Sequence, residues 1–159
     1  MDLFIWFERN GILRFHENEV RIYLVDKEEY LFIGPILYAH STERDWYWKN
    51  VRPLARGRVL EAGLGLGVAS KIILSSPQVE KLFTIESNPS VIASYDRNDP
   101  RHVVINSKFE DFISSYNPLV EGLRFDFIFI DTYYYCDEDL YPELLEVVHK
   151  SKELLKPNG

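Results

Sequence analysis

Three alternating glycines stand near the middle of the chain, in the segment Val59-Leu60-Glu61-Ala62-Gly63-Leu64-Gly65-Leu66-Gly67. Glycine permits a tight turn and a close approach of a ligand to the backbone, so Gly63, Leu64, Gly65 and Gly67 are candidate binding residues. The spacing G-x-G-x-G differs from the dinucleotide fingerprint G-x-G-x-x-G. Glu61, two residues before the first glycine, would repel a pyrophosphate and attract the ammonium of an amino-acid moiety. A glycine loop by itself is more often a structural turn than a ligand site.

A second acid, Glu86, ends the next apolar run, 19 residues after Gly67. An acid about 20 residues past a glycine loop, at the tip of the second strand, is placed to accept hydrogen bonds from both hydroxyls of a ribose. The alternative is a solvated carboxylate at a strand end. Two acids at adjacent strand tips beside a glycine loop favour a ligand site.

A third acid, Asp131, follows the nearly all-apolar run 125–130 and precedes Thr132-Tyr133-Tyr134-Tyr135. A carboxylate at the carboxyl end of a central strand lies on the ligand side of an open α/β sheet. There it can orient a nucleophilic amine or accept its proton. Alternatively, Asp131 caps the following turn and the three tyrosines pack against the core.

Alternating strands and helices are expected to position these residues. From Arg58 onward, strands are predicted at 58–62, 81–86, 102–106 and 125–131, and helices at 68–74, 89–95, 109–115 and 138–155. This alternation implies a doubly wound, mostly parallel sheet, and thus an α/β fold.

The first 40 residues are predicted to form a small β-meander. Four short apolar or β-branched runs indicate strands at 3–7, 12–15, 20–25 and 30–37. Asn10-Gly11 is typical of a type I′ hairpin turn, and Gly34-Pro35 should interrupt or bend the fourth strand. A short helix should follow, capped by Ser41 or Thr42 and ended by Pro53. Its aromatic residues 46–48 either line a pocket or pack in a core or interface.

The segment 58–159 resembles the class I S-adenosylmethionine-dependent methyltransferases. The resemblance rests on three motifs and one residue. The motifs are residues 59–67, the strand ending in Asp131, and Leu154-Leu155-Lys156-Pro157-Asn158-Gly159, and the residue is Glu86. The resemblance implies a Rossmann-like fold with S-adenosylmethionine as cofactor. The cofactor-binding residues it implies are Glu61, Gly63, Leu64, Gly65, Gly67, Glu86, Ser87, Ser107, Phe109 and Asp131, and Asp131 and Tyr133 would be catalytic.

Two subfamilies are similar over longer stretches. Guanidinoacetate-type methyltransferases have an Asp-Thr-Tyr like residues 131–133 here and use the aspartate towards a guanidino substrate. Spermidine synthase-like aminopropyltransferases share an N-terminal β-meander and a helix start similar to Thr42-Glu43-Arg44-Asp45. Two acids that would hold a polyamine in those enzymes fall on Leu66 and Tyr134. Their Gly-Asp after the third strand falls on Asn106-Ser107, which leaves Phe109 to pack on the purine.

The chain of 159 residues is long enough for one domain. We expect a β-meander extension over 1–40 and an S-adenosylmethionine-binding domain over 41–159. The binding domain would be truncated after its fourth parallel strand and the following helix. The strand ending at Asp131 would then be an edge. A homodimer across this edge, the meander, or a longer parent protein would protect it.

The composition limits the kinds of partner that the chain is expected to bind. The net charge is −7, with 18 basic and 25 acidic residues, which argues against an extended nucleic-acid surface and favours a small-molecule substrate. No apolar run approaches the length of a membrane span. No basic segment precedes the apolar run at the start of the sequence, so a signal peptide is not expected. The single cysteine, Cys136, excludes an internal disulfide and a thiolate zinc cluster, and the histidines show no metal spacing. A cytoplasmic protein is expected.

Three functions remain open from the sequence. The first is methyl transfer to a small nucleophile, with Asp131 orienting or deprotonating the acceptor. The second is aminopropyl transfer from decarboxylated S-adenosylmethionine. The third is a non-catalytic module for nucleoside binding or assembly.

Overall fold

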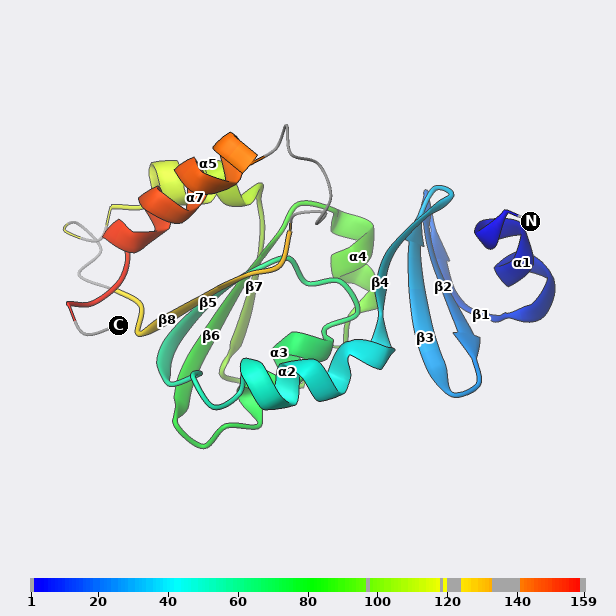
Figure 1. Ribbon diagram of the computed structural model, residues 1–159, viewed down its shortest axis with the longest axis horizontal. Coiled ribbons are helices and arrows are strands. Elements are labelled where there is room, and N and C mark those ends of the chain that lie inside the picture. Colours follow the sequence, from blue (N-terminus) through cyan, green and yellow to red (C-terminus); the bar gives the residue numbers. More distant parts are fainter. Residues whose placement is uncertain (1, 97, 118, 120–123, 133–140, 158–159) are drawn as a thin grey trace.

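The computed structural model describes residues 2–96, 98–117, 119, 124–132 and 141–157. Two four-stranded sheets follow each other along the chain, an antiparallel one and then a parallel one (Figure 1). This is the predicted α/β architecture, in which a β-meander precedes a Rossmann-like sheet. Within the part of the chain that the structure describes, no helix is long and apolar enough to cross a membrane.

The first apolar run forms a helix, α1 (Leu3–Asn10), so the prediction of a strand at 3–7 is wrong. The Asp2 carboxylate caps this helix by accepting a hydrogen bond from the Phe4 N–H at 2.9 Å. Phe4 and Phe7, one turn apart, both pack against the buried ring of Phe32. A cap and an apolar stripe at helical spacing therefore outweigh the strand propensity of the aromatic residues.

The turn residues of the meander also differ from the prediction. Asn10 ends helix α1, and the Gly11 N–H donates to the Phe7 carbonyl at 2.8 Å, so the predicted type I′ turn is wrong. Gly34, with a φ of +58°, makes a turn that divides the predicted fourth strand in two. The meander thus keeps four strands: β1 (Ile12–Glu17), β2 (Val20–Val25), β3 (Glu28–Ile33) and β4 (Ile36–His40).

A 3-10 turn, η1 (Ser41–Glu43), leads from β4 into helix α2 (Arg44–Asn50). Neither helix has a side-chain cap, so the predicted capping by Ser41 or Thr42 is wrong. The Ser41 hydroxyl instead accepts from the Glu29 N–H at 2.8 Å and donates to the Glu28 carboxylate. Ser41 therefore fastens the start of this segment to β3. The helix ends at Asn50, before Pro53.

The parallel sheet has the strand order β7-β6-β5-β8. Its strands are β5 (Gly57–Ala62), β6 (Val79–Glu86), β7 (His102–Asn106) and β8 (Phe127–Ile130). Its helices are α3 (Val68–Leu74), α4 (Pro89–Ser94), α5 (Phe109–Ser115) and α7 (Tyr141–Glu153). These elements agree with the predicted ones to within a few residues, except that the expected start of the last helix, at 138–140, lies outside the described residues. Strand β8 is an edge of its sheet, and the meander belongs to the other sheet.

Helices cover both faces of the parallel sheet (Figure 1). Helices α2 and α3 pack on one face around Val59 and Leu82, and α5 and α7 pack on the other face around Leu60 and Ile85. The meander lies beyond the carboxyl ends of the parallel strands, where buried Leu31 joins a cluster with residues of the glycine loop and α4. The meander therefore closes over the end of the sheet that carries the predicted site.

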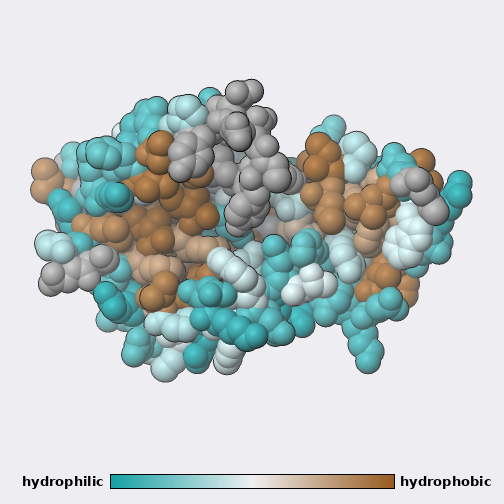
Figure 2. Space-filling view, in the orientation of Figure 1, coloured by the Kyte–Doolittle hydropathy of each residue, from teal (hydrophilic) through white to brown (hydrophobic). Residues whose placement is uncertain are grey.

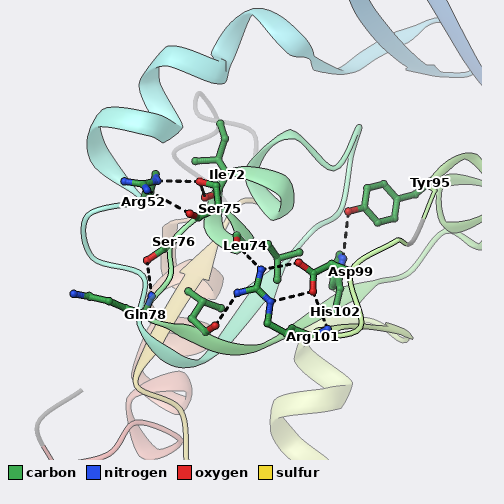
Figure 3. Close-up of polar contacts among 11 residues, drawn as sticks. Arg52, Ile72, Leu74, Ser75, Ser76, Gln78, Tyr95, Asp99, Arg101 and His102 are labelled. Atoms are coloured by element: carbon green, nitrogen blue, oxygen red, sulfur yellow. Dashed lines mark hydrogen bonds and ion pairs between the residues drawn. The ribbon is translucent and has the colours of Figure 1, made fainter.

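The amino end of the sheet is held by Arg101 (Figure 3). Its guanidinium donates to the carbonyl of Leu74 at 2.6 Å, where α3 ends, and to the carbonyl of Val79 at 3.0 Å, where β6 begins. The same group pairs with Asp99 at 2.7 Å, and this hydrogen-bonded partner lowers the pKa of Asp99. One side chain thus satisfies carbonyls at the end of a helix and the start of a strand.

Candidate functional site

The glycine loop joins β5 to α3 at the carboxyl end of the sheet. Gly63 has a φ of +88°, and a Cβ there would lie 2.6 Å from the Asp131 carbonyl oxygen. The loop therefore passes close to the end of β8, which only glycine allows at this position. Gly67, with a φ of +69°, is the last residue before α3, and its Cα packs against the ring of Tyr95.

Two pockets, of about 250 Å³ and about 230 Å³, adjoin at this loop. Both are lined by Tyr38, Gly63 and Thr132, so they lie on either side of these residues, and together they are called the cleft. The smaller pocket also includes Ile85, Glu86, Ser87, Ser107, Lys108, Phe109 and Glu110. The larger one also includes Leu37, Ala39, His40, Glu43, Tyr47, Leu64, Gly65, Leu66, Val68, Ala69 and Asp131.

Glu86 is held rigidly at the tip of β6. One carboxylate oxygen accepts from the Leu64 N–H at 3.0 Å and the other from the Asn88 N–H at 2.8 Å. Glu86 is almost completely buried, yet it lines the smaller pocket. A carboxylate has about four acceptor positions, so Glu86 retains capacity for two ligand hydroxyls. Ser107 and Phe109 lie in the same pocket, where a polar group and a flat ring suit a nucleoside.

Asp131 lies in the larger pocket together with a tyrosine and a second acid. The Tyr47 hydroxyl is 2.8 Å from Asp131 Oδ2 and 3.2 Å from Glu43 Oε2. Burial raises the pKa of Asp131 above its usual range. Burial and the two carboxylates raise the pKa of Tyr47 as well, so the hydroxyl keeps its proton and donates it. The two carboxylates are therefore joined through a neutral phenol.

The larger pocket is acidic. Glu43 and Asp131 contribute carboxylates, and among the described lining residues no lysine or arginine opposes them. His40 is the nearest basic group, with Nε2 4.0 Å from Glu43 Oε1. The remaining walls are largely apolar. A cationic ligand would match this lining, because a buried or half-buried carboxylate is stabilised by an opposite charge.

Glu61 lies beneath the cleft and does not line it. The side chain is fully buried, and its Oε2 accepts from Ser70 at 2.5 Å and from Thr84 at 2.6 Å. Thr84 in turn lies 2.7 Å from His102 Nε2. Burial raises the pKa of Glu61 to about 7, against the effect of these two hydrogen bonds. Its Oε1 has no hydrogen-bond partner in the described part of the chain. The direct contact with an ammonium group stays a prediction.

The structure brings most of the predicted site residues together. Gly63, Leu64, Gly65, Glu86, Ser87, Ser107, Phe109 and Asp131 all line the cleft. Glu61 and Gly67 lie behind it. Tyr133 lies outside the described residues. No cluster of metal-binding side chains occurs in the described ranges.

Sequence reasoning missed several residues of the larger pocket. Tyr38 and His40 come from β4, which only the tertiary fold brings to the glycine loop. Glu43 stands in the phrase similar to aminopropyltransferases, and that phrase was the available signal. Of the aromatic residues 46–48, Tyr47 is buried in the pocket, whereas Trp46 and Trp48 are about half exposed, at 53% and 51%.

The cleft fits S-adenosylmethionine. Gly63 and Gly65, both with positive φ, line the cleft and add no side chain that would fill it. The acid at the tip of β6 suits a ribose, and the acidic pocket beyond the loop suits a sulfonium and an ammonium group. Fold and cleft together define a class I S-adenosylmethionine-dependent methyltransferase-like protein.

Comparisons with known proteins narrow this class to a family. The chain belongs to the guanidinoacetate N-methyltransferase family, whose sequence profile matches residues 27–159. S-adenosylmethionine is therefore its cofactor. No curated protein matches the chain.

Solved structures share the fold at low sequence identity. Spermidine synthase from Thermotoga maritima is 19% identical with a TM-score of 0.67, covering 92% of this chain and 54% of its own length. The S-adenosylhomocysteine-bound methyltransferase PaMTH1 from Podospora anserina is 21% identical with a TM-score of 0.51, covering 74% and 49%. The chain thus spans about half the length of these structures.

Proposed function

We propose that this protein transfers a methyl group from S-adenosylmethionine to a small nitrogen nucleophile, an amine or a guanidine. The observation that carries the proposal is the acid pair of the larger pocket, in which the Tyr47 hydroxyl joins Asp131 and Glu43. An amine or guanidinium cation would complete this arrangement of charges. Membership of the guanidinoacetate N-methyltransferase family supports the same class of acceptor.

The residues of the cleft divide the work between binding and chemistry. When bound, the cofactor supplies a methyl group activated by a sulfonium. Glu86 would bind the ribose hydroxyls, and Phe109 would pack on the purine. Asp131 and Glu43 would hold the acceptor nitrogen next to the glycine loop, so that catalysis comes mainly from positioning.

Asp131 also has the chemistry of a proton acceptor. An acceptor bound as a cation has no available lone pair, so its nitrogen must give up a proton before or as it attacks the methyl group. The carbon–sulfur bond would break in the same step, with S-adenosylhomocysteine as the leaving group. Because burial raises the pKa of Asp131, this carboxylate is a better base than an exposed aspartate. Tyr47 donates to Oδ2 and leaves Oδ1 for the acceptor. In this proposal Tyr133 is a second residue at the reaction centre.

Aminopropyl transfer is the alternative, and one observation favours it. No lysine or arginine among the described lining residues of the larger pocket is available to pair with the carboxylate of S-adenosylmethionine. The decarboxylated cofactor lacks this group and would avoid the acids. Against this alternative, Leu66 contributes an apolar side chain where a polyamine would need a further carboxylate.

Calorimetric titration with S-adenosylmethionine, S-adenosylhomocysteine and decarboxylated S-adenosylmethionine separates these functions. We expect micromolar binding of the first two, followed by transfer of labelled methyl to members of an amine and guanidine panel. A preference for the decarboxylated form, with transfer of the aminopropyl group, would replace methylation by the alternative. Absence of binding to all three would contradict both and leave a non-catalytic module.

We further propose that the partners are a small-molecule substrate and a second copy of the chain. Apolar side chains gather over the half of the molecule that holds β8 (Figure 2), and β8 is an edge strand. Pairing across this edge would cover the apolar surface and the backbone groups on the outer side of β8. Light scattering at several concentrations tests this, and a monomer at all concentrations would exclude it.

A further inference from the structure

A separate pocket lies at the amino end of β5, under helix α5. Its volume is about 220 Å³, and it is lined by Arg58, Phe83, Ile105, Phe112, Ser115, Tyr116 and Phe125. None of these residues lines either pocket of the cofactor cleft. Arg58 begins β5, whereas the glycine loop follows the end of the same strand. The pocket therefore lies on the sheet face under α5 and has a lining separate from that of the cleft.

Arg58 is the charged group of this pocket, and its charge is unpaired. Its Nε is buried without a hydrogen-bond partner, and within the described ranges its side chain makes no ion pair. The carboxylate of Asp126 binds the Arg58 backbone N–H at 2.8 Å and Lys156 at 2.8 Å, and it forms no ion pair with the Arg58 guanidinium. A buried Nε donor without an acceptor is costly, and an arginine without an ion pair is unexpected in a chain of net charge −7.

Aromatic rings make up most of the remaining lining. The guanidinium carbon lies 4.9 Å from the ring centre of Phe83 and 5.8 Å from that of Phe125. Stacking on ring faces leaves the N–H groups of a guanidinium, which lie in its plane, free for a ligand. The Ser115 hydroxyl is already used, since it donates to backbone carbonyls of its own helix at 2.8 and 3.1 Å. The pocket therefore combines one cation with flat apolar walls.

We propose that this pocket binds a small arylcarboxylate, that is, a flat apolar ring bearing one carboxylate. The carboxylate would pair with Arg58, for which a planar anion is the best geometric match. The ring would pack against Phe83, Phe112 and Phe125 with offset or edge-on geometry. An inorganic anion would leave the aromatic walls unfilled, and a neutral arene would leave Arg58 unpaired.

Titration with sodium benzoate tests the proposal, with acetate and benzyl alcohol as matched probes for the charge and the ring alone. We expect saturable benzoate binding at least tenfold tighter than that of either control. S-adenosylhomocysteine should not displace benzoate, because no residue of this pocket lines the cofactor cleft. Absence of benzoate binding, equal binding of benzyl alcohol or acetate, or displacement by S-adenosylhomocysteine would each overturn it.

Arg58→Met and Arg56→Met form a matched pair of variants. Both remove one positive charge, but Arg56 is exposed and outside the pocket. We expect Arg58→Met to lose at least tenfold in benzoate affinity and Arg56→Met to keep it. Equal affinities in the two variants would contradict the assignment. If Arg58→Met does not fold, NMR titration of the wild-type protein with benzoate replaces it. Benzoate must then change the chemical shifts of Phe83, Phe112 and Phe125, and unchanged shifts would contradict the proposal.

Discussion

Arg101, near the amino end of the parallel sheet, and the acids at the carboxyl end differ in whether their charges are paired within the protein. At the amino end, Arg101 is paired with Asp99 and with two carbonyls (Figure 3). At the carboxyl end, Glu43, Glu86 and Asp131 line a cleft, and in the described part of the chain no lysine or arginine pairs with any of them. Arg101 therefore has its partners within the protein, whereas the acids of the cleft have no lysine or arginine partner among the described residues.

This difference separates groups that serve stability from groups that serve function. A paired charge whose partners are all internal contributes to the folded state and gains nothing from a ligand. An acid held in a pocket without a cation lowers the free energy of unfolding, and a cationic ligand would offset this cost. Substitutions at the two ends should therefore have opposite signatures in stability and in activity.

The largest effect is expected from Asp131→Asn at the carboxyl end. Asparagine keeps an acceptor for Tyr47 but removes the charge and the base, so methyl transfer should fall by about 1,000-fold, or about 4 kcal/mol. Cofactor affinity should stay within a few-fold, and the melting temperature should stay equal or rise. Steady-state kinetics, calorimetry and thermal unfolding check these results. A fully active variant would refute the role of Asp131.

Glu61 predicts a dependence of stability on pH, because it is an acid buried below the cleft without a cationic partner among the described residues. The pKa of Glu61 is about 7 in the folded protein, against 4.5 for an exposed glutamate. Between these two pH values the folded state therefore binds more protons than the unfolded state. The free energy of unfolding should therefore fall as pH rises from about 4.5 to about 7. Glu61→Gln should remove on the order of 3 kcal/mol of this fall. Parallel urea titrations at several pH values test it, and identical slopes would disprove it.

Arg101→Met should show the signature of the amino end. The variant loses hydrogen bonds from a charged donor to two carbonyls and to Asp99, which costs about 2 kcal/mol for a half-exposed group. The free energy of unfolding should fall by this amount while cofactor affinity stays unchanged in the folded protein. Lys49→Met, at an exposed position, is a matched control for loss of charge. A drop in cofactor affinity without loss of stability would break the comparison.

The smallest effect is expected from Tyr47→Phe. The phenol joins two acids without reacting itself, so its loss should lower kcat about tenfold, or about 1.4 kcal/mol, by misplacing Asp131. It should also shift the pH dependence of kcat to higher values, because Asp131 loses a hydrogen bond that lowers its pKa. Kinetics from pH 5 to 9 measure both changes. An unchanged pH profile would indicate that Tyr47 only fills space.

Local signals predicted much of the fold. Helices α3 and α5 and strand β7 have the predicted bounds, because each apolar run is delimited by glycine, proline or polar residues. The prediction failed at 3–7, where Asp2 and the pairing of Phe4 and Phe7 with Phe32 favour a helix. That contact is between residues far apart in the sequence, and local propensity does not contain it.

The sequence by itself determined the glycine loop, the acids at the strand tips and the alternation that makes the sheet parallel. Parallel strands align their carboxyl ends, so Glu86 and Asp131 must lie at the same edge of the sheet. Only the tertiary structure decided that β4 and α2 close over this side, which brings His40, Glu43 and Tyr47 to Asp131. Only the tertiary structure decided that Glu61 points into the core and that Arg58 stays unpaired among aromatic rings. These outcomes depend on which faces pack together, and packing between distant elements is set by the whole fold.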